Sequence, residues 1–266
     1  MNLDALNASL ADTPFAGKRH HYATIASTNT EAMRQASAGA ETWSVYVADQ
    51  QTAGRGRGAH AWHSSPADGL YFSVVLRPNL SLADALWLSL AAGLAAHDAI
   101  AKVVGVKPDV RWPNDLMLTE NGVSKKFGGI LIETQTDGDR LRHAVVGIGI
   151  NVNHADFPAE LADIATSLRL AAGREHSREA LLAEMLRCLH DEVVRLESTW
   201  PPDAAIVPRL EAASTWLRGK AVRVTDHDNP AQNYTGTTAG LNARGFLLVK
   251  TAEGLRTVVS GGVREA

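Results

Sequence analysis

The chain has 266 residues, of which 45% are hydrophobic and 21% are charged. This composition is typical of a globular protein with a full core, and the length allows one large domain or one domain with a smaller second one. Lysine and arginine number 26 against 29 aspartates and glutamates, which gives a net charge of −3. That balance removes any argument for bulk attraction to nucleic acid or to an anionic membrane surface.

Cysteine content and hydropathy exclude three further classes. Cys188 is the only cysteine, so an internal disulfide framework and a zinc site built on several thiolates are both excluded. The first residues lack the basic start and continuous apolar run of an export signal. The longest apolar stretch, residues 82–105, is too interrupted for a membrane span, since it contains Asp84, His97, Asp98 and Lys102. We therefore expect a cytoplasmic protein.

Short β-rich runs alternate with helical segments from residue 20 to about residue 155. Strands are predicted over residues 44–50, 70–76, 130–134 and 144–152. Thr28 and Glu31 fit a capping box at the start of one helix, and Ser81 fits the start of a second that runs to about Val104. Residues 127–153 are typical of an antiparallel hairpin with its turn at 137–139. The pattern favours a mixed, largely antiparallel sheet with helices.

The pattern of predicted elements changes in the C-terminal third of the chain. Apolar residues recur at helical spacing from Leu181 to Leu196, and Trp200, Pro201 and Pro202 end that helix. A second helix is predicted from Pro202 or Asp203 to about Trp216, followed by short strands over residues 221–225, 234–240, 246–250 and 255–260. We therefore expect an α+β domain over residues 1–214 and a small SH3-like β-barrel over residues 215–266.

A glycine–arginine loop begins at the end of the strand predicted over residues 44–50. Its sequence is QQTAGRGRGAHAW, over residues 50–62. Glycines allow the backbone to fold closely around a ligand, and Arg55 and Arg57 can face an anion. The spacing matches neither a Walker A loop nor a dinucleotide fingerprint, and the stretch alone is equally compatible with an exposed loop that binds nothing. His60 and His63 lack a third ligand nearby, so a metal site is not expected.

Three other stretches each have a structural and a functional interpretation. Pro113, Asn114 and Asp115 form an ordinary turn, or they place an amide and a carboxylate together beside a basic residue. Lys126 extends harmlessly to water, or its ammonium meets a ligand that lies against the glycines after it. Residues 147–153, GIGINVN, form a core strand of small residues, or a strand kept bare where an apolar ligand packs.

Together these stretches resemble the biotin protein ligases. Ser27-Thr28-Asn29, GRGRG at 54–58, WPND at 112–115, KFGGIL at 126–131 and GIGINVN at 147–153 occur in that family's order and approximate spacing. The resemblance covers residues 20–155, and the terminal strands resemble the family's small C-terminal domain. One departure is that Ala59 and His60 stand where the common bacterial motif GRGRxGRxW has glycine and arginine, so residues 58–61 are expected to make different contacts.

The resemblance implies a class II synthetase-like catalytic fold and a definite reaction. Biotin is activated with ATP and Mg²⁺ as biotinoyl-5′-AMP, and the acyl group then passes to a lysine of a biotin carboxyl carrier protein, such as that of acetyl-CoA carboxylase. Relatives that act as repressors carry a winged helix-turn-helix before the Ser-Thr-Asn motif, whereas 26 residues precede Ser27 here. We expect a ligase without nucleic-acid or membrane partners, as a monomer or weak homodimer.

The resemblance also implies roles for individual residues. Arg55 and Lys126, with Arg57, would offset the repulsion between the biotin carboxylate and the α-phosphate at one point. Asp115 would orient and deprotonate the carrier lysine, and Trp62 would pack against adenine or against its own loop. The implied binding residues are Ser27, Thr28, Asn29, Gln51, Gly54, Arg55, Gly56, Arg57, Trp62, Asn114, Lys126 and Gly128.

Two alternatives remain open from the sequence. A lipoate or octanoyl transferase shares the fold and also modifies a carrier lysine, but it needs no pairing of Ser-Thr-Asn with GRGRG. A non-enzymatic biotin sensor would bind biotin without releasing pyrophosphate.

Overall fold

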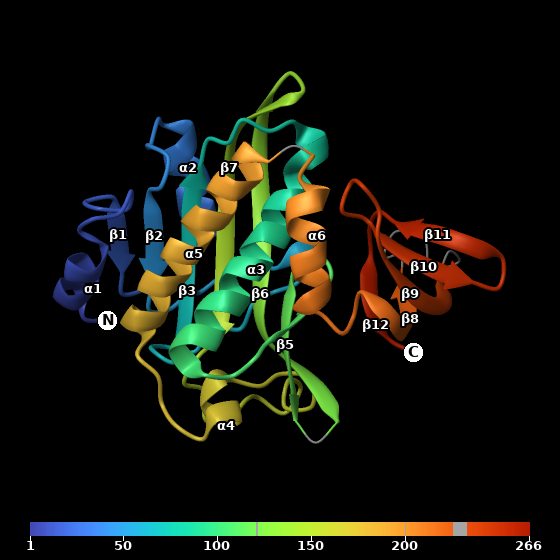
Figure 1. Cartoon of the computed structure of the whole chain (residues 1–266). Coiled ribbons are helices and arrows are strands. Elements are labelled where there is room, and N and C mark those ends of the chain that lie inside the picture. Colours follow the sequence, from blue (N-terminus) through green and yellow to red (C-terminus); the bar gives the residue numbers. More distant parts are fainter. Residues whose placement is uncertain (121, 200, 226–232) are drawn as a thin grey trace.

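The computed structural model describes residues 1–120, 122–199, 201–225 and 233–266, and it contains two sheets (Figure 1). The larger sheet has seven strands, and among the described residues only its β1–β2 pair is parallel. In spatial order the strands are β1 (Arg19–Tyr22), β2 (Val45–Ala48), β3 (Gly69–Leu76), β7 (Arg140–Asn151), β6 (Val123–Asp137), β5 (Asp115–Glu120) and β4 (Asp109–Arg111). The predicted mixed, largely antiparallel sheet is confirmed.

Helices cover both faces of this sheet, because the strand residues alternate between two apolar clusters. Val45, Val74 and Val146 belong to the main core, whereas their neighbours Tyr46 and Val75 pack with α2. On the main-core face, α3 and α5 lie against each other, and α6 lies beside α3 (Figure 1). The helices are α1 (Leu3–Leu10), α2 (Thr28–Ser37), α3 (Ala85–Val104), α4 (Leu168–Ala172), α5 (Arg178–Ser198) and α6 (Asp203–Ala212).

The most apolar helix is a core element of this fold. Residues Leu82–Val104 are long and apolar enough to cross a membrane by length and composition, with a mean hydropathy of 1.2 in the best window, and 72% of that window is buried inside the protein. Trp87, Leu90 and Leu94 are each about 1% exposed. The apolar surface of α3 is therefore accounted for by packing between the sheet and α5.

The C-terminal sheet has five strands, all paired antiparallel. They are β11 (Gly254–Val258), β10 (Leu247–Thr251), β9 (Tyr234–Leu241), β8 (Arg218–Thr225) and β12 (Gly262–Glu265), in spatial order. The indole nitrogen of Trp112 donates to the carbonyl of Gly245 at 2.9 Å. A side-chain carbon on Gly245 would lie 3.0 Å from Leu90 on α3, so this turn packs closely against the larger domain. The predicted small C-terminal β domain is confirmed.

Several element boundaries differ from the sequence predictions. The helix predicted to reach Trp216 ends at Ala212, because Ser214 turns the chain by donating to the carbonyl of Val110 at 2.6 Å. Strands β6 and β7 are longer than predicted, and Asp115 belongs to β5 rather than to the turn before it. Trp200, part of the predicted helix stop, lies outside the described residues. The elements α1, β1, α4 and β12 were not predicted.

Candidate active site

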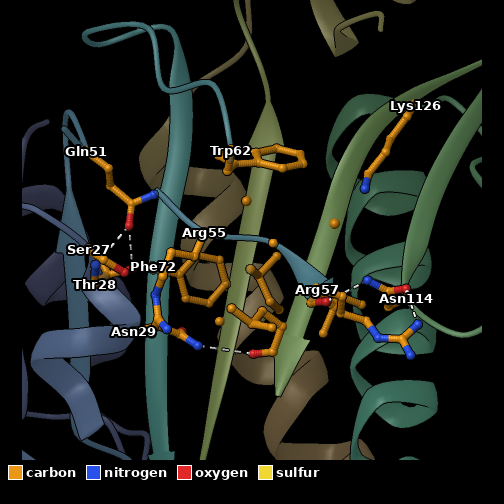
Figure 2. A pocket seen from close by; sticks show the side chains of 17 residues that line it. Ser27, Thr28, Asn29, Gln51, Arg55, Arg57, Trp62, Phe72, Asn114 and Lys126 are labelled. Carbon is orange, nitrogen blue, oxygen red and sulfur yellow. Dashed lines mark hydrogen bonds between the residues drawn. The ribbon is translucent and has the colours of Figure 1, made fainter. Parts of the chain in front are cut away.

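Two adjoining hollows open on the α2 side of the large sheet. With the open space at their mouths included, the inner pocket spans about 460 Å³ and the outer cleft about 2750 Å³. The outer cleft reaches the C-terminal domain at residues 260–264. Ser27, Thr28 and Gln51 lie at one side of the inner pocket and Lys126, Arg57 and Asn114 at the other, with Trp62 between them (Figure 2). The remaining residues around the inner pocket are Asn29, Arg55, Gly56, Phe72, Gly129, Ile130, Leu131, Gly147, Ile148 and Gly149.

The start of α2 supplies the polar end of the pocket. Ser27 caps the helix, because its hydroxyl accepts from the amide of Thr30 at 3.4 Å; the predicted cap was Thr28, one residue later. The amide and hydroxyl of Thr28 instead donate to the Gln51 side-chain oxygen at 2.8 and 3.1 Å. Ser27, Thr28 and Asn29 are each 4% exposed. The structure thus brings together the predicted ring-binding residues.

Two residues at this end were missed by the sequence analysis. The hydroxyl of Ser73 on β3 lies 2.8 Å from the Thr28 hydroxyl and 2.6 Å from the Asn29 side-chain oxygen. The Asn29 side-chain nitrogen donates to Glu133 on β6 at 2.8 Å, and Glu133 also pairs with Arg55 at 2.7 Å. Ser73 is a lone polar side chain in the apolar strand β3, and that pattern was its available signal, whereas Glu133 begins the polar end of β6 and gives no such signal.

The glycine–arginine loop folds back on itself. The amide of Gly56 donates to the carbonyl of His60 at 2.7 Å, and the amide of Trp62 donates to the carbonyl of Gly54 at 2.9 Å. A side-chain carbon on Gly54 would lie 2.8 Å from the Trp62 carbonyl, so this close approach requires glycine. Gly56 lines the pocket, whereas Gly54 shapes the loop without lining either hollow.

The glycines of β6 and β7 make room for protein side chains. Gly129 pairs with Gly149 across the two strands, and side-chain carbons there would lie 3.2 and 2.8 Å from the Trp62 indole. A side-chain carbon on Gly147 would lie 1.9 Å from the Asn29 side-chain oxygen. An apolar ligand was one of the two interpretations given for the small residues of β7. The structure shows that its glycines leave room for the side chains of Asn29 and Trp62.

We expect Gly147→Ala to lower the free energy of unfolding by about 1–3 kcal/mol, because Asn29 is held from both sides and cannot yield. Urea denaturation measures this loss. If the clash with Asn29 is the cause, the double variant Gly147→Ala, Asn29→Ala loses less than the sum of the two single variants. Additive losses would locate the strain elsewhere.

Gly128 does not face the pocket. A side-chain carbon there would meet Ile150 at 2.7 Å and Leu116 at 3.0 Å, both in the main core. Successive strand residues point to opposite faces, so Gly129 is the glycine that lines the pocket. The predicted binding role of Gly128 is corrected accordingly.

A group of charges forms the other end of the pocket. The Lys126 ammonium lies 2.5 Å from one oxygen of Asp115, and the guanidinium of Arg111 lies 2.6 Å from the other. Burial acts to raise the pKa of Asp115, but the charges of Lys126 and Arg111 outweigh burial and hold the pKa below its usual value. Asp115 is therefore ionised at neutral pH, and each of its two carboxylate oxygens pairs with a cation.

A β-bulge positions Lys126. Leu116 pairs with Gly128 and Met117 with Lys126, so Phe127 is an extra residue in β6. On the other side of this strand end, the amide of Lys126 donates to the carbonyl of Ile164 at 2.8 Å. The ammonium of Lys126 lies 5.4 Å from the centre of the Trp62 ring, a cation–π contact.

The three predicted cations line one pocket but do not meet at one point. Arg57 donates to the Asn114 side-chain oxygen at 3.3 Å. The next residue in the chain, Asp115, pairs with Lys126. Arg55 instead pairs with Glu133, close to the polar end. Arg57 and Lys126 both lie at the far end of the pocket, whereas Glu133 binds the guanidinium of Arg55 near the polar end, so the predicted convergence of all three cations is wrong for Arg55.

The described residues contain no group of three or more histidine, cysteine or acidic side chains that could hold a metal ion. The pocket as a whole has hydroxyl and amide groups at one end, a floor that includes Phe72 and Ile148, and cations at the other end. Such an arrangement suits an elongated ligand with an uncharged polar ring at one end and an anionic group at the other.

Comparison with known proteins agrees with this geometry. Residues 22–151 match the Biotin/lipoate A/B protein ligase family, and residues 218–263 match the Biotin protein ligase C terminal domain. The chain is 34% identical to the bifunctional ligase/repressor BirA of Bacillus subtilis, over 90% of this chain and 71% of that protein. It is 32% identical to the biotin--[acetyl-CoA-carboxylase] ligase of Mycobacterium tuberculosis, over 89% of this chain and 84% of that one.

Among solved structures, the biotin protein ligase from Aquifex aeolicus in complex with biotin and ATP superposes with a TM-score of 0.78. It is 29% identical in sequence, and the match covers 94% of this chain and all of that one.

Proposed function

Because this chain belongs to the biotin protein ligases, we propose that the two ends of its pocket serve the two substrates of a biotinylation reaction. The protein activates biotin with ATP as biotinoyl-5′-AMP and transfers the biotinoyl group to a lysine of a carrier protein. The observation that carries this assignment is one pocket lined at one end by the buried Ser27 and Thr28 with Gln51, and at the other end by the cations Arg57 and Lys126.

The polar end suits the ureido ring. A buried ring with two N–H donors and one carbonyl needs a partner for each group, since each unpaired group costs about 1–3 kcal/mol. Thr28 holds the side-chain oxygen of Gln51, and the Ser27 hydroxyl is held by the amide of Thr30. Asn29 already bonds Ser73 and Glu133, so we assign it to positioning this end.

The cationic end suits the activation step. The biotin carboxylate oxygen attacks the α-phosphorus of ATP, a new O–P bond forms, and the bond to the leaving pyrophosphate breaks. Two anions approach each other in this step, and Lys126 and Arg57 offset their repulsion and the charge developing on the phosphorus oxygens. Asn114 holds the Arg57 guanidinium at 3.3 Å and borders both hollows, which supports a place beside the nucleotide phosphates.

We propose that Mg²⁺ accompanies ATP, where it would neutralise charge on the phosphate oxygens. Asp115, the carboxylate at the cationic end, already pairs with Lys126 and Arg111, so we assign it no part in holding the ion.

The transfer step uses the outer cleft. The amine of the carrier lysine attacks the acyl carbon of the adenylate, and AMP leaves. Asp115 lines this cleft, and its lowered pKa makes it a weak base. We therefore assign Asp115 to holding Lys126 and orienting the incoming lysine rather than to removing its proton.

The partner we propose is the biotin carboxyl carrier protein of acetyl-CoA carboxylase or a similar carboxylase. Relatives from Mycobacterium tuberculosis and Paracoccus denitrificans bear the name biotin--[acetyl-CoA-carboxylase] ligase, which supports this choice. We further propose action in the cytoplasm as a monomer or weak homodimer, without a nucleic-acid partner, which fits the net charge of −3.

Incubation of the protein with ATP, Mg²⁺ and either biotin or lipoate tests the function. Pyrophosphate release with biotin, followed by labelling of a carrier lysine, is the expected result. Release with lipoate alone would assign a lipoate ligase, and tight biotin binding without release would assign a sensor.

We expect Arg55→Ala to release the adenylate into solution about tenfold faster, because the loop loses its charged contact with β6. Arg55 pairs with Glu133 at 2.7 Å and is the contact that ties this part of the loop to the strand. Stopped-flow measurement of adenylate dissociation checks the rate. An unchanged rate would show that the loop does not retain the intermediate.

A further inference from the structure

We infer that Glu133 is a positioning residue that links recognition of the ring to closure of the glycine–arginine loop. This inference rests on the proposed function and adds to it a residue for which the sequence analysis assigned no role. Glu133 lies on β6 and touches one residue from each of the two segments that must act together, Asn29 at the start of α2 and Arg55 in the loop.

The contacts fix the orientation of Asn29. Its nitrogen donates to Glu133 at 2.8 Å, and its oxygen lies 2.6 Å from the hydroxyl of Ser73. The same Ser73 hydroxyl lies 2.8 Å from that of Thr28, and the backbone amide of Thr28 donates to the Gln51 side-chain oxygen at 2.8 Å. A continuous set of hydrogen bonds therefore runs from the proposed ring-binding residues to the carboxylate of Glu133.

The second contact of Glu133 is electrostatic. One guanidinium nitrogen of Arg55 lies 2.7 and 3.0 Å from the two carboxylate oxygens. Glu133 is 27% exposed and Arg55 is 47% exposed, so the pair is partly screened by water and holds the loop without locking it. The charge of Arg55 is also neutralised there, which leaves the polar end of the pocket suited to an uncharged ring.

Strand geometry explains why Glu133 can reach both segments. It pairs with Val145 on β7, and Val145 packs against α2. Alternate residues of β6 face the same side, so Glu133 lies on the pocket side with Gly129 and Leu131. Asp137 is another acid of this strand, at its exposed end beyond the pocket, and provides a matched control.

Two substitutions separate the two contacts. In Glu133→Gln the side-chain oxygen still accepts from Asn29 but the charge is lost, so the KM for biotin stays within about twofold while the adenylate dissociates about fivefold faster. In Glu133→Ala both contacts are lost, and the KM for biotin also rises about tenfold. Asp137→Asn leaves both quantities unchanged.

A purely structural role would not produce this split. Wild-type dissociation from Glu133→Gln, or a wild-type KM in Glu133→Ala, overturns the inference. If Glu133→Ala does not fold, as judged by circular dichroism, the double variant Glu133→Gln, Arg55→Ala decides: it should release the adenylate no faster than Arg55→Ala alone, and additive acceleration overturns the inference.

A measurement without substrate separates this inference from the proposed function. Trypsin cleaves after Arg57, and we expect about fivefold faster cleavage there in ligand-free Glu133→Gln, because the loop is less well held. An unchanged cleavage rate refutes the role of Glu133, whatever the enzyme does with biotin. Failure of the wild-type protein to form the adenylate refutes the proposed function alone.

Discussion

In the Lys126→Ala variant, pyrophosphate release in the presence of biotin and ATP falls about a hundred- to a thousandfold. The substitution removes an ammonium at the end of the pocket where we propose that the carboxylate and the α-phosphate meet. The fold survives, because Lys126 is one-third exposed and Asp115 keeps its contact with Arg111 at 2.6 Å. A single-turnover assay with excess enzyme measures the chemical step, and circular dichroism checks the fold.

Lys125 provides the matched control. It is the preceding residue of β6, and its ammonium donates to the carbonyl of Ala162 at 2.7 Å, away from Asp115. Lys125→Ala should therefore turn over within about threefold of wild type, as expected for a surface substitution. Near-normal turnover in Lys126→Ala, or an equal loss in both variants, would show that this cation has no special role.

Asp115→Ala is expected to lower the free energy of unfolding by about 3–5 kcal/mol. Arg111 is 7% exposed, and removal of the carboxylate leaves its buried charge without its ion-pair partner beside the charge of Lys126. Urea denaturation measures the loss. Glu120→Ala, at the exposed end of the same strand, is the control and should change the free energy by less than about 0.5 kcal/mol. A similarly small effect for Asp115→Ala would contradict the buried ion pair.

The pH dependence of this effect distinguishes the two roles considered for Asp115. Its pKa in the folded protein lies below the usual 3.8. Burial acts to raise this pKa, but the charges of Lys126 and Arg111 stabilise the carboxylate and outweigh burial. Its contribution is therefore fully present above pH 3.8 and is lost as the pH falls through the lowered pKa. The difference in unfolding free energy between wild type and Asp115→Asn should stay constant from pH 7 to about 5 and shrink only in more acidic solution. A difference that instead grows as the pH falls from 7 to 5 would indicate a raised pKa and a general base.

Much of the fold was predictable from local patterns. The continuous apolar run of β3 reflects burial on both faces, and the helical spacing of apolar residues in α5 reflects burial on one face. The hairpin of β6 and β7 was predictable from two β-rich runs around a turn. The polar edge strand β1, with the sequence RHHY, shows no such pattern and was missed. The four-residue strand β12 was missed too, since Val263 is its only buried residue.

The sequence predicted which segments form the candidate site but not how their side chains are arranged in space. The ordered motifs identified Ser27, Gln51, Arg57, Asn114 and Lys126, and all of them line the pocket. Arg55 was misplaced because its partner, Glu133, is 78 residues away in the chain and no local pattern reports such a pairing. Gly129 rather than the predicted Gly128 lines the pocket, and the bulge at Phe127, which sets the register there, has no signature in the sequence.

The hydrogen bond between Trp112 and Gly245 has a mechanical consequence for the whole molecule. Trp112 stands two residues before Asn114 and three before Asp115, and Arg264 of the C-terminal domain lies 3.9 Å from Asp115. The contact between the two domains therefore lies beside the proposed reaction centre. A carrier protein bound to the small domain would be joined through this contact to the groups proposed to orient its lysine, so docking and chemistry would be coupled.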